Sequence, residues 1–234
     1  MKGFLFVFGG SPAPLTWGMR PPLADFGSDV YLIGAVARQP EFRGTQLAFV
    51  VAGEERVRMP SGEFREMAFY QRCLLDRQHP AAKAVLYGQA LALEGTLLAT
   101  KNQFNNHMKV VVVASDLRLL ERPASDLIRD AGGGYRLKRG YQQVIISGRA
   151  SDNAVPIAND NGPMLTFSLA VPGGAGTQIN WIEVKSFMTN HLEMMVHRGQ
   201  RVVARGRLWN RDKYIGNGRR HTFSVIDAGE IGQG

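Results

Sequence analysis

The feature that most constrains this chain is a long internal repeat. Residues 88–97 and 199–208 both begin with Gly-Gln, continue as an apolar stretch, and end with Gly, one variable residue and Leu. Upstream, Val-Tyr-Leu-Ile-Gly at 30–34 matches Val-Ile-Ile-Ser-Gly at 144–148. Matching positions lie 111 residues apart (88 to 199) and 114 residues apart (30 to 144). Because this spacing is the size of a small domain and too long for a solenoid repeat, we expect two copies of one folded unit.

Turn-forming residues mark the boundary between the copies. Residues 130–134, Asp-Ala-Gly-Gly-Gly, are typical of a flexible joint. Nothing in the first 20 or so residues matches the repeat, so we expect a disordered extension there, or a start of translation at Met19. The expected divisions are an N-terminal extension at 1–27, a first unit at 28–122, a linker at 123–139 and a second unit at 140–234.

Each unit has the hydrophobic periodicity of five strands. One helical candidate lies between the third and fourth strands of each unit, at 80–87 and at 190–196, the second after the N-cap pair Thr189 and Asn190. Five strands with a helix in this position are the order of the OB-fold, a partly open Greek-key barrel, whereas a β-sandwich would need more strands. We therefore predict an all-β chain with two tandem OB-folds. The strands are expected at 30–36, 47–52, 68–75, 90–100 and 109–114 in the first unit, and at 143–149, 165–171, 180–187, 201–210 and 221–227 in the second.

The charge of the chain favours a polyanionic partner. The formal net charge is +8 and the isoelectric point is about 9.9, which suits a nucleic acid or an anionic membrane surface. The excess is uneven, with 13 Lys and Arg against 7 Asp and Glu in residues 135–234, and 15 against 13 in residues 1–134. No apolar stretch approaches the roughly 20 residues of a membrane span. The single cysteine, Cys73, excludes an internal disulfide and fits a reduced cytoplasmic setting.

The sequence holds no motif for catalysis or metal binding. The five histidines lack metal-ligand spacing, and His191 and His197 are six residues apart, on different faces of the expected helix. There is no Cys-x-x-Cys pair, no phosphate loop ending in Lys-Ser or Lys-Thr, and no nucleophile elbow. Cys73 is expected in the core. We therefore expect a binding protein rather than an enzyme, without metal or cofactor.

Several segments of the sequence resemble the bacterial single-stranded DNA-binding protein family. Residues 30–43 resemble its first strand and the following turn, with Gln39 where Asp is usual. Phe-Tyr-Gln-Arg-Cys at 69–73 resembles its Glu-Trp-His-Arg-Val segment, and the two Gly-Gln segments resemble its fourth strand. Two units joined by residues 126–134 resemble the double-length form of the Deinococcus–Thermus lineage, over roughly residues 28–228.

The resemblance implies a homodimer with four OB-folds that binds and protects single-stranded DNA in replication, recombination and repair. It also implies a cytoplasmic, nucleoid-associated location. The family normally ends in a disordered tail with an acidic tip that recruits other enzymes, whereas this sequence stops at Glu-Ile-Gly-Gln-Gly, residues 230–234. Recruitment of replication and repair proteins through such a tip is therefore not expected. Two alternatives stay open: a tail-less partner of a full-length relative or repair protein, and an RNA-binding OB protein.

A single strand is bound by a positive groove with aromatic faces on which bases stack. In residues 201–213, strand alternation puts the small apolar residues on one side and a basic ladder around Trp209 on the other. A solvated polar face is the alternative interpretation of this ladder. The ladder comprises Arg201, Val203, Arg205, Arg207, Trp209, Arg211 and Lys213.

The third strand of the second unit has the same combination, because Trp181, Lys185 and Phe187 share one side. Trp181 and Phe187 fall where the family places stacking aromatics, although packing against the barrel or a partner is the alternative. In the first unit Tyr70 takes the position of Trp181, but the ladder is absent, so we expect the second unit to hold most of the affinity. The candidate DNA-binding residues are Tyr70, Arg72, Lys101, Phe104, Lys109, Arg149, Trp181, Lys185, Phe187, Arg205, Arg207, Trp209, Arg211, Lys213, Tyr214, Arg219 and Arg220.

Overall fold

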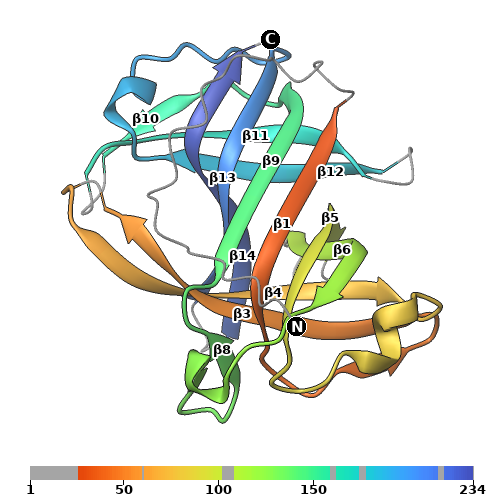
Figure 1. Cartoon of the computed structure of the whole chain (residues 1–234). Helices are drawn as coiled ribbons and strands as arrows, with labels where there is room; N and C mark the ends of the chain where they lie inside the picture. Colours follow the sequence, from red (N-terminus) through yellow and green to blue (C-terminus); the bar gives the residue numbers. More distant parts are fainter. Residues whose placement is uncertain are drawn as a thin grey trace, which may run out of the picture.

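The computed structural model describes residues 26–59, 61–101, 108–158, 162–173, 178–215 and 219–233. It has two β-barrels, one in the upper and one in the lower half of Figure 1. The first is built from β1 (Gly27–Val36), β3 (Gln46–Arg58), β4 (Phe64–Asp76), β5 (Ala90–Lys101) and β6 (Met108–Leu119). The second is built from β9 (Tyr141–Ala150), β11 (Met164–Pro172), β12 (Ile179–Ser186), β13 (Arg201–Ile215) and β14 (Arg219–Gln233). Two short strands pair antiparallel with the second strand of each barrel, β2 (Glu41–Arg43) with β3 and β10 (Val155–Ile157) with β11.

Both barrels close in the same way. The third and fifth strands pair in parallel, with Cys73 opposite Val112 in the first barrel and Glu183 opposite Val225 in the second. The first strand also pairs with both the second and the fourth. This closure is that of the OB-fold, so the prediction of two tandem OB-folds is confirmed.

The helices predicted between the third and fourth strands are not α-helices. Residues 80–87 form a 3-10 helix, η1 (Pro80–Ala84), and the second unit has a single 3-10 turn, η3 (Thr189–His191). Segments this short cannot repay the cost of helix nucleation. Local side-chain contacts favour the tighter turn instead: the Ala81 amide donates to His79 Nδ1 (3.2 Å), and Ser186 Oγ bonds to His191 Nδ1 (2.7 Å).

The repeated glycines of the sequence have a structural reason. In each barrel the fifth strand has one extra residue opposite the fourth, with a register shift between Arg205 and Gly206 and another between Glu94 and Gly95. A Cβ atom on Gly206 would lie 2.0 Å from the backbone oxygen of Asp227, and one on Gly95 would lie 2.3 Å from that of Val113. Because no side chain fits at these distances, both bulges require glycine.

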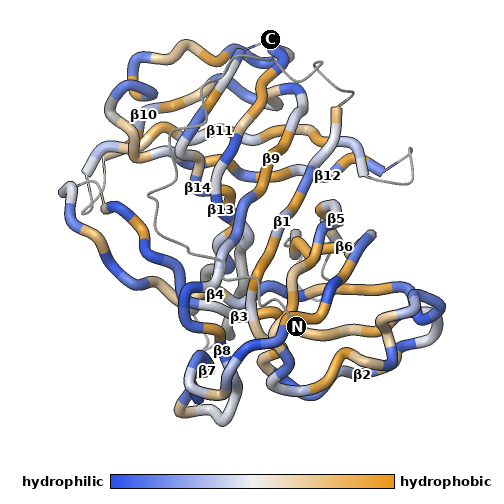
Figure 2. The backbone as a smooth tube through the Cα atoms, in the orientation of Figure 1, coloured by the Kyte–Doolittle hydropathy of each residue, from blue (hydrophilic) through white to orange (hydrophobic). Residues whose placement is uncertain are grey.

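The two barrels meet through their first strands, which lie side by side in the middle of Figure 1. β1 and β9 pair antiparallel, and Val30 lies opposite Val144, its own counterpart in the repeat. An approximate two-fold axis therefore passes between these two valines, and the barrels meet as the subunits of an isologous dimer do. Buried apolar residues of both barrels form one continuous cluster, and Figure 2 shows hydrophobic stretches along β1 and β9.

Buried polar side chains fix how one barrel sits on the other. Asn180 of β12 is fully buried, donates to the carbonyl of Leu97 (3.1 Å) and accepts from the amide of Ala99 (2.8 Å) on β5. In the opposite direction, buried Gln71 of β4 donates to the side-chain oxygen of Gln142 (3.0 Å) and to the carbonyl of Leu208. These hydrogen bonds favour one arrangement, because any other would leave the side chains of Asn180 and Gln71 unpaired.

The segment 123–139, predicted as a linker with a flexible joint at 130–134, is folded onto the first barrel. It contains the 3-10 turn η2 (Ala124–Asp126) and a hairpin of β7 (Leu127–Arg129) and β8 (Tyr135–Leu137). β8 pairs in parallel with β3, and Leu137 is buried against Ala35. The glycines do form the turn of this hairpin, but the apolar residues on either side of them give it a core. We name residues 123–139 the connecting hairpin.

Candidate nucleic-acid interface

Four residues lie side by side across four neighbouring strands of the second barrel. Trp181 of β12 pairs with Ala170 of β11, Ala170 with Arg149 of β9, and Arg149 with Arg201 of β13. The neighbours along these strands, such as Ile182, are buried, so the four residues point away from the core. With strands about 4.8 Å apart, this set spans about 14 Å. We name these four residues the barrel-2 row.

Trp181 offers an open stacking surface at one end of the barrel-2 row. Its side chain is 49% exposed, and its cross-strand neighbour Ala170 is too small to cover the indole. Ile179, two residues earlier on the same side of β12, is also exposed. An exposed tryptophan on an OB-barrel face is suited to stacking against a base.

Two guanidinium groups lie at the other end of the row. Arg149 and Arg201 are direct cross-strand partners, an arrangement in which like charges repel. Arg149 is exposed and donates to the carbonyl of Gly199 (2.9 Å), and it forms no ion pair with any residue that the structure describes. The ring of Phe26 lies against both, 5.3 Å from Cζ of Arg149 and 4.8 Å from Cζ of Arg201. Two adjacent cations on the same barrel face as an exposed tryptophan provide charges for phosphate and a flat surface for a base.

The remaining candidates on β12 lie close to Trp181. Lys185 is on the same side of the strand and forms an ion pair with Glu183 (2.9 Å). Phe187 follows the last residue of β12 and is half-buried.

The basic ladder of β13 is partly engaged by acidic residues of the protein itself. Arg207 Nε lies 2.9 Å from Oε2 of Glu55, which belongs to β3 of the first barrel. Burial raises the pKa of the Glu55 carboxyl, and Arg207 acts against that rise. Arg205 lies 3.5 Å from Glu230. Part of the ladder therefore joins strands and barrels, and contact of Arg205, Arg207 or half-buried Trp209 with DNA stays a prediction.

Several predicted residues lie beyond what the structure describes in side-chain detail. Phe104 is outside the described residues. The backbone is described, without side-chain placement, at Lys101 of β5, Lys109 of β6, Arg211, Lys213 and Tyr214 of β13, and Arg219 and Arg220 of β14.

The corresponding row of the first barrel is different in composition. Tyr70 pairs with Ala52, and Ala52 with Ala35, so alanine stands where the second barrel has Arg149. Ala35 and Ala52 are fully buried, and Leu137 of the connecting hairpin packs on Ala35.

An ion cluster ties Tyr70 to the connecting hairpin. Tyr70 Oη donates to the carboxylate of Asp130, and Arg136 bridges Asp130 and Glu54, with 2.8 Å to Glu54. Burial, and then the hydrogen bond to Asp130, raise the pKa of Tyr70. Arg72, two residues further along β4, is exposed. The first barrel therefore uses this face for its own hairpin, whereas no hairpin of the described residues covers the same face of the second barrel.

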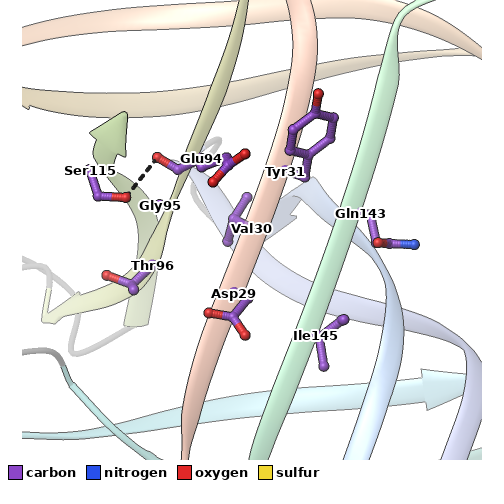
Figure 3. A pocket seen from close by; sticks show the side chains of 9 residues that line it. All are labelled: Asp29, Val30, Tyr31, Glu94, Gly95, Thr96, Ser115, Gln143 and Ile145. Atoms are coloured by element: carbon purple, nitrogen blue, oxygen red, sulfur yellow. Dashed lines mark hydrogen bonds between the residues drawn. The ribbon is translucent and has the colours of Figure 1, made fainter. Parts of the chain in front are cut away.

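A shallow hollow of about 240 Å³ lies across β5, β1 and β9, and its β9 residues, Gln143 and Ile145, are on the same side of that strand as Arg149. Figure 3 shows Asp29 and Glu94 at its edge, with the Ser115 hydroxyl donating to the backbone oxygen of Glu94 (3.3 Å). Its described lining includes two carboxylates and no lysine or arginine. Because these charges repel phosphate, the hollow is unsuited to a nucleic acid.

The described residues also contain no set of three or more His, Cys, Asp and Glu that could hold a metal ion. Cys73 is buried, and burial raises the pKa of its thiol, which disfavours the reactive thiolate. Within the same residues, no helix is long and apolar enough to cross a membrane.

Phe26 is the residue of this site that the sequence did not indicate. It belongs to the stretch predicted as a disordered extension. The only sequence signal is a single aromatic residue just before a strand. That Phe26 contacts Arg149 and Arg201 could not be predicted, because the contact depends on the pairing of β1 with β9.

Comparison with known proteins gives a consistent result. No protein-family model matches the chain. The single-stranded DNA-binding protein of Deinococcus radiodurans is 27% identical over 223 residues, which cover 86% of this chain and 73% of that protein. The single-stranded DNA-binding protein of Thermus aquaticus is 32% identical over 130 residues, 52% of this chain and 49% of that protein.

Solved structures agree with the fold. The wild-type single-stranded DNA-binding protein from Thermus aquaticus superimposes with a TM-score of 0.69 at 21% identity, covering 90% of this chain and 94% of that one. A deletion mutant of the same protein gives a TM-score of 0.69 at 22% identity, covering 89% and 95%. The chain thus has two tandem OB-folds, and along most of its length it is similar to the single-stranded DNA-binding proteins of Deinococcus and Thermus.

Proposed function

We propose that the chain binds single-stranded DNA with little dependence on base sequence and protects it during replication, recombination and repair. The observation that carries this proposal is the barrel-2 row, in which an exposed tryptophan and two arginines share one open barrel face. Stacking and phosphate contacts are available from every nucleotide, since every base has a flat face and every linkage a charge. The similarity to proteins named for single-stranded DNA binding supports the same conclusion.

The two barrels are proposed to contribute unequally. The barrel-2 row is open and basic, whereas the first barrel has alanines and its own hairpin at the equivalent place. We propose that the connecting hairpin belongs functionally to the first barrel, although the sequence placed it in a separate linker at 123–139.

We further propose a homodimer with four OB-folds that acts without catalysis in the cytoplasm, on the DNA of the nucleoid. Exposed aromatic residues on the outer face of the barrel junction support self-association. Tyr31 and Tyr141 lie edge to face there, with ring centres 6.0 Å apart, and each is more than a third exposed. Burying such rings is a common source of interface stability.

Titration with poly-dT, followed by tryptophan emission, tests the proposed binding. We expect a saturable change in emission at low salt and an affinity that falls as salt is raised, because each neutralised phosphate releases counterions. If Arg149 and Arg201 each neutralise one phosphate, the plot of log affinity against log salt has a slope of about −1.4 or steeper. Unchanged emission at low salt would rule the proposal out, and tighter binding of an RNA of equal sequence would indicate an RNA-binding protein instead.

A further inference from the structure

The residue before the first strand belongs spatially to the second barrel. The start of β1 pairs with β9, with Gly27 opposite Ser147. Phe26 therefore lies over the second barrel, although it precedes the first barrel in sequence. Its side chain is half-buried, and its ring is directed at Arg149 and Arg201.

This placement addresses the difficulty created by two neighbouring cations. Arg149 and Arg201 are cross-strand partners, so their guanidinium groups repel each other. The face of an aromatic ring attracts cations through its quadrupole, and both Cζ atoms lie within 6 Å of the ring centre. A guanidinium held by its flat face can still donate hydrogen bonds from the N–H groups at its edge, apart from the Nε of Arg201, which is buried.

We propose that Phe26 is a positioning residue that holds Arg149 and Arg201 as a two-guanidinium clamp for backbone phosphate, next to the base that stacks on Trp181. This inference rests on the proposed function and adds to it how the phosphate site is ordered. A fixed pair of guanidiniums binds better than two mobile ones, because less conformational freedom is lost when the phosphate arrives. Arg149 lies two strands and Arg201 three strands from Trp181, along the barrel-2 row.

The test compares Phe26→Leu with Phe26→Tyr in the full chain, using a dT oligonucleotide at several salt concentrations. Leucine keeps an apolar side chain and removes the ring, whereas tyrosine keeps the ring. Two exposed cation–π contacts correspond to a combined effect of about 5- to 30-fold. We expect Phe26→Leu to lose affinity within that range and to make the salt slope shallower by about 0.7, the contribution of one phosphate on a single strand. Phe26→Tyr should bind as the wild type does.

The outcomes separate this inference from the proposed function. A wild-type chain that does not bind DNA contradicts the proposed function itself. A wild type that binds, with Phe26→Leu equal to it in affinity and slope, overturns the clamp alone, and so does a Phe26→Tyr variant as weak as Phe26→Leu. If Phe26→Leu lowers the melting temperature, the comparison moves to an Arg149→Gln/Arg201→Gln background. There Phe26→Leu should have no further effect on affinity, and an undiminished loss would show that the ring acts through packing.

Discussion

Replacing Trp181 by alanine should weaken the binding of a dT oligonucleotide by about 5- to 150-fold, the range that corresponds to about 1–3 kcal/mol for one stacked base. The indole is half-exposed and lies beside Ala170, so its removal takes away the stacking surface without opening a cavity in the core. The melting temperature should therefore change little. Fluorescence anisotropy of a labelled oligonucleotide measures the loss directly, because it does not depend on the protein's own tryptophans.

Tyr70→Ala is the matched control, since Tyr70 occupies the equivalent position on the first barrel. We expect a loss of less than about 3-fold, because the cation beside Tyr70, Arg136, is already paired with Asp130 and Glu54, and alanines take the place of the arginines of the barrel-2 row. The Tyr70 hydroxyl is also engaged by Asp130 of the connecting hairpin. Equal losses for Trp181→Ala and Tyr70→Ala would contradict the unequal roles of the two barrels.

Replacing Gly206 by alanine should have the largest effect on stability, a loss of more than about 3 kcal/mol. The added Cβ would lie 2.0 Å from the oxygen of Asp227 and 2.7 Å from its carbonyl carbon, and both are backbone atoms. Relief therefore requires the two central strands β13 and β14 to separate, with loss of their ladder of hydrogen bonds. Chemical denaturation monitored by circular dichroism measures the change in the free energy of unfolding.

Gly229→Ala controls for the general cost of replacing a glycine in this bulge. Gly229 is the extra residue on β14, and a Cβ there would meet no heavy atom within 4 Å. Its unfolding midpoint should stay close to that of the wild type. If both variants unfold at the same denaturant concentration, the bulge does not require glycine at 206.

The architecture could be predicted from the sequence because it depends on local patterns that occur twice. Alternating burial along each strand follows from period-2 hydrophobicity, and the repeated Gly-Gln and Gly-x-Leu segments mark the fourth strand and its bulge. The outward direction of Trp181 follows from the same alternation. The helical segments were predicted in the right places, but their short length made them 3-10 turns.

The features that could not be predicted depend on pairing between distant parts of the chain. The register of β1 against β9 decides that Phe26 lies over Arg149, although 123 residues separate them (149 − 26 = 123). The ion pair of Arg207 with Glu55 joins two barrels whose relative placement is not encoded in either repeat alone. The connecting hairpin looked like a loose joint because its strands are only three residues long, too short for periodicity to be recognised.

Photo-crosslinking of an oligo-dT substituted with 5-iodouracil tests the central claim most directly, since this base couples to aromatic side chains stacked on it. After digestion, mass spectrometry locates the crosslinked residue. The barrel-2 row predicts that the main crosslink is at Trp181 and that Tyr70, engaged by the connecting hairpin, is labelled weakly. A main crosslink at Tyr70 or at Trp209, with Trp181 unlabelled, would contradict the assignment of the binding face to the barrel-2 row.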